Sequence, residues 1–161
     1  MFAQLDTKSV YSFMDSVVDL NSYVARAKEL GYQALGLMDR DNLYAAYHFA
    51  QLASRNGLRP LIGMEANLFY EGRKIPFRLL AKNNQGYKNL MKLATELSSG
   101  QREFTAFSDY LNAIALILPS EDWEPGMTLG SEVFIGVRPE DVGKEFDYPV
   151  VPLHTVRYFE N

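Results

Sequence analysis

Two short apolar runs in the first half of the chain each end in a carboxylate. Residues 34–38 carry no polar side chain and are followed by Asp39, and residues 61–64 are followed by Glu65. Uninterrupted apolar runs are typical of strands that are covered on both faces of a parallel sheet. The carboxyl ends of such strands meet at the edge where α/β folds place their chemistry, so we expect Asp39 and Glu65 to share that edge.

Amphipathic segments alternate with these strands. One helix is expected from Asn21 to Leu30, a second from a cap at Asp41 or Asn42 to Gly57, and a third after the break at residues 83–86. Their expected inward positions are Tyr23, Val24, Ala27 and Leu30 in the first, Leu43, Ala46, Tyr47 and Ala50 in the second, and Tyr87, Leu90, Met91, Ala94 and Leu97 in the third.

About seven strands are expected in total. The others include a hairpin that turns at residues 71–73, and a short helix is expected at 107–111. The expected strand ranges are 2–5, 34–38, 61–70, 75–81, 113–118, 133–137 and 149–153. This alternation predicts an α/β fold with right-handed crossovers.

Length and composition narrow the class of protein. A chain of 161 residues fits one domain, and the absence of cysteine excludes thiolate metal sites and cysteine nucleophiles. No apolar run reaches the roughly 20 residues that span a bilayer, and residues 1–15 do not read as a signal peptide. We therefore expect an intracellular, cytoplasmic protein with no membrane contact.

The net charge of −4 is unevenly distributed: residues 1–118 carry +2 and residues 119–161 carry −6. No basic stripe is visible, which disfavours direct DNA binding by this chain. We interpret the basic residues of the middle region as a solvated face: Arg73, Lys74, Arg78, Lys82, Lys88 and Lys92.

Candidate chemistry lies mainly at strand ends. Asp6, Asp15, Asp39, Glu65 and His154 would suit a divalent cation, but carboxylates in such places also cap helices, and we favour that structural interpretation. His48 and His154 are too few for a zinc site. Glycine-rich nucleotide loops and the nucleophile elbow of serine hydrolases are absent.

The order of four stretches resembles a known family. They are residues 2–16, 27–31 with 37–44, 60–66 and Leu80-Ala81-Lys82-Asn83-Asn84-Gln85-Gly86-Tyr87-Lys88-Asn89-Leu90. Together they resemble the N-terminal PHP (polymerase and histidinol phosphatase) domain of the alpha subunit of bacterial replicative DNA polymerase III. The resemblance implies a distorted seven-stranded β/α (TIM-like) barrel, with residues 1–161 as a single PHP domain and an N-terminal piece of a much longer polymerase.

The resemblance also implies that the family's metal site is degenerate here. The His-x-His pair of metal-binding members falls on Asp6 and Lys8, and another histidine ligand falls on Arg40. Only Asp15 and Glu65 keep ligand-type residues. The former metal-site positions are Asp6, Lys8, Asp15, Arg40, Glu65, Pro76, Thr155 and Arg157, with Asp39 and His154 as supporting residues.

Three cations in a pocket built for metal would repel a metal ion. We therefore expect Lys8, Arg40 and Arg157 to be neutralised by Asp6, Asp15, Asp39 and Glu65. That would leave no metal, no cofactor and no catalytic residue in this domain. The longer protein would be a DNA-directed DNA polymerase, a nucleotidyltransferase that uses Mg²⁺ at a site beyond residue 161.

In that setting the domain would be a scaffold. Its expected partners are the polymerase palm and thumb of the same chain, and a proofreading exonuclease or other replisome proteins, with Trp123 and the acidic segment 121–147 as a candidate surface. DNA would be contacted only through the longer protein. The alternatives are a metal-dependent phosphoesterase (pyrophosphatase or exonuclease-like) with one metal on Asp6, Asp15, Glu65 and His154, or an unrelated α/β binding module.

Overall fold

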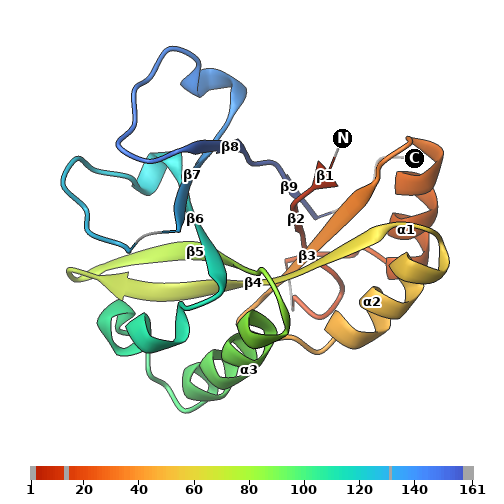
Figure 1. Cartoon of the computed structure of the whole chain (residues 1–161), viewed down its shortest axis with the longest axis horizontal. Coiled ribbons are helices and arrows are strands. Elements are labelled where there is room, and N and C mark those ends of the chain that lie inside the picture. Colours follow the sequence, from red (N-terminus) through yellow and green to blue (C-terminus); the bar gives the residue numbers. More distant parts are fainter. Residues whose placement is uncertain (1–2, 13–14, 131, 158–161) are drawn as a thin grey trace.

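A curled sheet forms the centre of the computed structural model, which describes residues 3–12, 15–130 and 132–157 (Figure 1). Seven strands are hydrogen-bonded in the order β1-β3-β4-β5-β6-β7-β8. They are β1 (Ala3–Gln4), β3 (Ala34–Arg40), β4 (Arg59–Tyr70), β5 (Arg73–Ala81), β6 (Ile114–Pro119), β7 (Val133–Val137) and β8 (Val150–Pro152). Phe2, where the first strand was expected to begin, lies outside the described residues.

A second, very short pairing closes the ring. β2 (Asp6–Thr7) pairs in parallel with β9 (Thr155–Val156). Because β2 directly continues β1 and β9 follows β8, this pairing joins the two edges of the large sheet, as Figure 1 shows between β8 and β3. The expected distorted seven-stranded β/α barrel is confirmed, with β1/β2 and β8/β9 each acting as one broken strand.

The strand directions are mixed. β4 and β5 form the expected antiparallel hairpin, whose turn places Glu71 at φ 49° and Gly72 at φ 78°, and β5 is also antiparallel to β6. The remaining pairs are parallel. The parallel strands β3, β4 and β9 therefore end at the barrel mouth, where α/β barrels place functional side chains.

Helices cover the outside of the sheet unevenly (Figure 1). α1 (Leu20–Glu29) and α2 (Ala46–Arg55) bury Val24, Phe49 and Ala53 against β3, in a cluster with Leu35 and Leu37. α3 (Asn84–Ser98) and the 3₁₀ helix η1 (Phe104–Tyr110) cover β4, β5 and β6. After β6 and β7 the chain forms only the 3₁₀ turns η2 (Ser120–Asp122) and η3 (Pro139–Asp141).

Two helix starts differ from the sequence prediction. α1 is capped by Asp19, whose side chain accepts a hydrogen bond from Ser22 N at 2.9 Å, rather than by Asn21. α2 begins at Ala46 without a side-chain cap, because Asp41 instead occupies a left-handed turn at φ 55°. A carboxylate outside a helix can serve either as a cap or in a turn, and the sequence pattern does not distinguish the two.

The buried faces of the helices match the prediction in part: Tyr23, Val24 and Ala27 of α1 and Leu90 and Leu97 of α3 are buried as predicted, but other predicted inward positions are not. Leu30, Tyr47 and Met91 are 57%, 71% and 51% exposed, whereas Phe49 and Leu93 are fully buried. The predictions followed one apolar stripe of 3.6-residue period in each helix. Neighbouring apolar residues created a second stripe of similar quality, so the pattern alone did not select the buried one.

The signature stretch at residues 80–90 builds the junction between β5 and α3. Asn83 caps α3 by accepting hydrogen bonds from Gln85 N at 2.9 Å and Gly86 N at 3.0 Å. A Cβ at Gly86 would collide with the Ala113 carbonyl oxygen, so only glycine fits there. Asn89 donates a hydrogen bond to the Asn112 carbonyl at 2.8 Å, which fixes the turn before β6.

The interior of the barrel is divided between an apolar end and a charged end. Met38, Ile117 and Leu153 are buried together in the apolar part. The first strand crosses so close to β3 that a Cβ at Gly36 would overlap the Leu5 carbonyl. No helix of the described residues is long and apolar enough to cross a membrane.

Candidate functional site

Two carboxylates and an ammonium group are buried together inside the barrel mouth. Lys8, Asp6 and Glu65 have side-chain exposures of 0%, 0% and 3%. Lys8 Nζ forms an ion pair with Asp6 Oδ1 and another with Glu65 Oε2, the second at 3.2 Å. The lysine ammonium therefore lies between the two carboxylates.

A second buried cation, Arg78, contacts the same two carboxylates. Its Nε donates to Asp6 Oδ2 at 3.0 Å, and its Nη2 lies 3.3 Å from Glu65 Oε2. Its Nη1 donates to the Pro76 carbonyl at 2.7 Å. Two cations and two anions thus form a compact cluster. Most of their polar atoms have an ion-pair or hydrogen-bond partner, as buried charges require.

The sequence interpretation of Arg78 was wrong. We assigned it to a solvated face, but it is 5% exposed. A usable signal existed: Arg78 is the only charged residue between residues 75 and 81, and it alternates with the buried, outward-packed Phe77 and Leu79. Period-two alternation places such a residue inside the barrel.

Further ion pairs lie at the rim of the barrel mouth. Arg40 Nε donates to Glu65 Oε1 at 3.0 Å, and its Nη2 donates to Asp15 Oδ2 at 2.8 Å. Arg157 Nε forms an ion pair with Asp15 Oδ1 at 2.9 Å. Asp15 therefore links the residues after β3 to those after β9. The ion pairs expected for Lys8, Arg40 and Arg157 are all present.

Asp39 has a different role from the one expected. Its carboxylate accepts hydrogen bonds from Ser9 N at 2.6 Å, Ser9 Oγ at 2.7 Å and Ser12 Oγ at 2.7 Å. It has no ion pair within the described ranges. Asp39 thus anchors the loop that carries Lys8, and it neutralises no cation of the network directly.

The electrostatics favour the charged form of the buried carboxylates. Burial opposes ionisation of Asp6, but the charges of Lys8 and Arg78 outweigh it and keep the pKa of Asp6 below its ordinary value. Burial likewise acts against Glu65, and Lys8, Arg78 and Arg40 lower the pKa of Glu65. Both groups are therefore carboxylates at neutral pH.

The remaining predicted positions surround this network. Thr155 Oγ1 donates to Asp6 Oδ2 at 2.6 Å, which ties β9 to β2. Pro76 contributes only its carbonyl oxygen, to Arg78. The His154 side chain is exposed and lines a neighbouring cavity with Thr155 and Arg157.

The four residues of the alternative metal site are not assembled into one cluster. Asp6 and Glu65 face each other across Lys8, Asp15 binds two arginines at the rim, and His154 lies in the neighbouring cavity. Among the residues that the structure describes, no three His, Asp or Glu side chains are placed to hold a metal ion. The donor set, with ammonium and guanidinium groups between the carboxylates, does not fit a dication.

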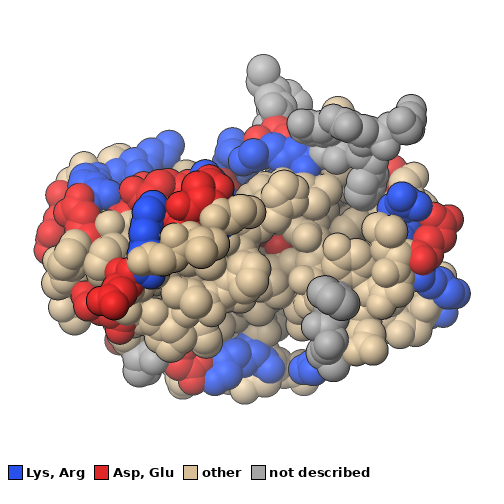
Figure 2. Space-filling view, turned by 90° about the horizontal axis from the view of Figure 1, so that it is seen from above, with Lys and Arg blue, Asp and Glu red and all other residues tan. Residues whose placement is uncertain are grey.

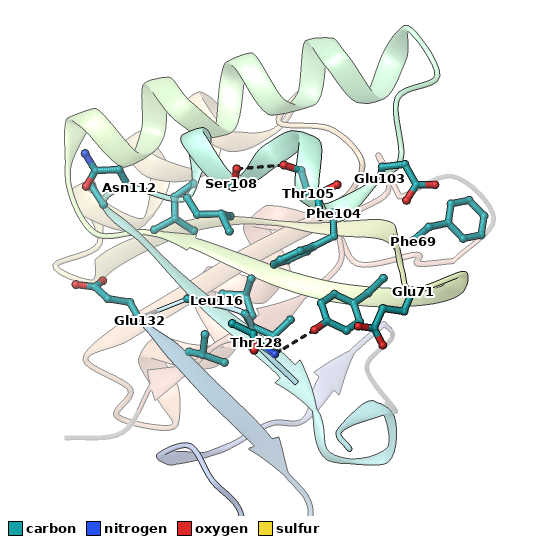
Figure 3. Close-up of a pocket in the computed structure, with 17 residues that line it drawn as sticks. Phe69, Glu71, Glu103, Phe104, Thr105, Ser108, Asn112, Leu116, Thr128 and Glu132 are labelled. Carbon is teal, nitrogen blue, oxygen red and sulfur yellow. Dashed lines mark hydrogen bonds between the residues drawn. The ribbon is translucent and has the colours of Figure 1, made fainter. Parts of the chain in front are cut away.

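A larger cavity, of about 640 Å³, lies outside the barrel beside the β4–β5 hairpin and η1. Figure 3 shows the side chains of Phe104 and Leu116 within it, with Glu71, Glu103 and Glu132 around it. None of its lining residues belongs to the ion-pair network.

Half of the acidic residues in the segment expected as a docking surface form ion pairs. Glu121 pairs with Arg138 at 2.6 Å, and Glu124 pairs with Arg73. Trp123, expected to be exposed, is only partly so: its ring packs edge-on against Phe146 at 5.2 Å between centroids. On the face seen in Figure 2, acidic and basic side chains are interspersed and form no continuous basic stripe.

Comparisons with known proteins place this geometry in a family. Residues 4–124 match the model of the PHP domain. The chain is 45% identical, over 99% of its length, to DNA polymerase III subunit alpha of Streptococcus pyogenes serotype M1, and 33% identical over 74% of its length to that of Bacillus subtilis (strain 168). It spans 16% and 11% of the lengths of these relatives.

Among solved structures, an amidohydrolase from Chromobacterium violaceum is similar in fold, with a TM-score of 0.50 and 19% identity over 61% of this chain and 34% of that one. The fold, the matched residues and the identity to the polymerase relatives agree. The chain therefore belongs to the PHP domain family, as the counterpart of the PHP domain in the alpha subunit of DNA polymerase III.

Proposed function

We propose that this PHP domain is a structural domain of a replicative polymerase alpha subunit, in which an ion-pair network stands where related domains bind metal. The observation that carries the proposal is the buried Lys8 ammonium between Asp6 and Glu65. A metal ion needs the same carboxylate oxygens, and Lys8 and Arg78 already use them.

The charge balance supports this proposal. Binding a dication would place two further positive charges beside Lys8, Arg78 and Arg40, all within ion-pair distance of Glu65 or Asp6. Two unit charges 4 Å apart interact by about 4 kcal/mol at an effective dielectric constant of about 20, so the repulsion is large. Lys8 is fully buried, so its ammonium group cannot reach solvent unless the barrel mouth opens.

The network also has a mechanical role. It connects β2 through Asp6, β4 through Glu65, β5 through Arg78 and the chain after β9 through Arg157. Within the described residues the strand pairing that closes the barrel, β2 with β9, is two residues long, so side-chain bridges across this seam help to hold the ring shut. A closed, rigid barrel is what a scaffold requires.

The remaining parts of the proposal concern the longer protein. The palm and thumb of the same chain are the proposed partners, together with a proofreading exonuclease or other replisome proteins. Template-directed nucleotidyl transfer with Mg²⁺ would belong to those other parts, and the proposed location is the cytoplasm. The support is the identity to polymerase alpha subunits across almost the whole chain.

Phosphoesterase assays test the absence of metal chemistry. The purified protein is incubated with a phosphomonoester and a phosphodiester chromogenic substrate in the presence of Mn²⁺, Zn²⁺ or Mg²⁺. We expect no turnover above the buffer blank. Metal-dependent turnover that disappears in an Asp15→Ala, Glu65→Ala double variant, but survives in an Arg26→Gln control on the far side of α1, would overturn the proposal.

A further inference from the structure

A small cavity beside the ion-pair network has arginines as its charged lining residues. It has a volume of about 210 Å³, and its lining residues are Arg78, Arg138, Leu153, His154, Thr155 and Arg157. No carboxylate residue lines it. Although the network as a whole is nearly balanced in charge, Arg78 and Arg157 line this cavity and none of its carboxylates does. A hollow lined by one sign of charge concentrates ions of the other sign.

One of these cations is rigidly held. The side chain of Arg78 is 6% exposed, and contacts with Asp6, Glu65 and the Pro76 carbonyl fix its plane. A guanidinium group fixed before a ligand arrives loses little conformational entropy on binding. The Arg78 guanidinium group therefore lines the cavity in a fixed orientation before any ligand binds.

The other two arginines have donors to spare. Arg157 forms an ion pair through Nε, and neither of its Nη atoms has a partner among the described residues. Arg138 uses only Nη2 from its side chain, in a half-exposed pair with Glu121. Exposed pairs of this kind contribute at most about 1 kcal/mol, so Arg138 can turn toward a ligand at little cost.

We propose that this cavity, the arginine pocket, binds a phosphate-type oxyanion, either inorganic phosphate or inorganic diphosphate, without a metal. The planar guanidinium fork matches the oxygen spacing of phosphate, and charge-assisted bonds of this kind are the strong ones. The volume suits an inorganic anion, because whole small-molecule ligands occupy pockets of about 300–1,000 Å³. The proposal goes beyond the scaffold role, which requires no ligand.

Isothermal titration calorimetry of the purified protein tests the proposal. Diphosphate, phosphate and acetate are titrated separately at the same ionic strength. We expect saturable one-to-one binding of a phosphate anion and none of acetate. Tighter binding of diphosphate than of phosphate would assign the pocket to diphosphate, and equal or weaker binding would assign it to phosphate. Failure of both anions to saturate, or equal binding of acetate, would overturn the proposal.

Matched variants locate the binding site. Arg138→Gln and Arg157→Gln each remove one guanidinium group, and each is expected to weaken binding by about ten-fold or more in Kd, the equivalent of one lost charge-assisted hydrogen bond. Arg26→Gln removes the same charge from an exposed pair on α1, 3.0 Å from Glu29, and should leave Kd unchanged. Equal weakening in all three variants would show general charge attraction and overturn the assignment.

A thermal-unfolding measurement separates lost binding from structural damage. It is needed because Arg157→Gln also removes the ion pair with Asp15. Arg138→Gln leaves the buried network intact, and its far-ultraviolet circular dichroism and Tm without ligand should equal those of the original protein. Loss of diphosphate-induced stabilisation in Arg138→Gln, whose fold and network are unchanged, supports the pocket. Hydrolysis of diphosphate would contradict the scaffold proposal and leave the binding proposal standing, so the two fail separately.

Discussion

Replacing Lys8 with methionine tests the network at its centre. Lys8 is fully buried and pairs with Asp6 and, at 3.2 Å, with Glu65. Methionine keeps much of the volume and removes only the charge. Asp6 and Glu65 would then face each other without the cation between them, with Arg78 and Arg40 as the remaining partners.

The expected loss is large compared with that of a surface pair. At an effective dielectric constant of about 20, a contact at 3.2 Å corresponds to about 5 kcal/mol of attraction, part of which is offset by the desolvation of both groups. Removing one partner of a buried pair costs about 3–5 kcal/mol, since the other charge stays buried. We therefore expect Lys8→Met to lower the free energy of unfolding by about 3–5 kcal/mol.

Urea denaturation followed by circular dichroism measures this loss. The control is Arg26→Met, which removes an ion pair of roughly 60% exposed side chains and should change stability by less than about 1 kcal/mol. The double variant Lys8→Met, Glu65→Gln should be more stable than the sum of the single variants predicts, because the unpaired negative charge is gone. Equal effects of Lys8→Met and Arg26→Met would refute the reasoning.

Three further outcomes follow from the same contacts. Because Asp6 and Glu65 have pKa values below their ordinary range in the folded protein, their stabilising contribution is complete above about pH 5 and is lost as the pH falls below about 4, measured as Tm against pH. Gly36→Ala should cost about 2 kcal/mol or more, because the new methyl group overlaps the Leu5 carbonyl and the strand must shift. Asn83→Ala should cost about 1 kcal/mol in urea denaturation, since two amides at the start of α3 lose their acceptor.

Each of these outcomes has a result that contradicts it. A flat Tm between pH 3 and 6 would show that the buried carboxylates do not stabilise the folded state. Unchanged stability of Gly36→Ala would mean that the first strand does not cross β3 closely. An Asn83→Ala variant as stable as the original would assign the signature stretch a role other than starting α3.

Much of the fold could be predicted because its strands are unusually clear. The runs at residues 34–38 and 113–118 are apolar on both faces and became β3 and β6 almost unchanged. The closing pair was not predicted, because β9 is two residues long and Thr155-Val156 has no pattern by itself. Such a strand exists only through its tertiary partners, Asp6 and Thr7.

The site was predictable mainly through the family resemblance. Lys8 and Arg40 were singled out because they stand where metal-binding members of the family carry histidine, whereas their own surroundings are polar. Arg78 was missed because it was grouped with nearby surface cations, although its own strand is apolar on either side. Asp39 was assigned to the network from its place at a strand end, but its side chain points to Ser9 and Ser12 instead.

Elemental analysis tests the central claim most directly. The purified protein is dialysed against Zn²⁺ and Mn²⁺, then against metal-free buffer, and its metal content is measured by inductively coupled plasma mass spectrometry beside the Asp15→Ala, Glu65→Ala variant. The account predicts far less than one metal ion per chain in both proteins, because Lys8 and Arg78 already neutralise the carboxylates. Close to one ion per chain in the original protein, lost in the variant, would contradict it.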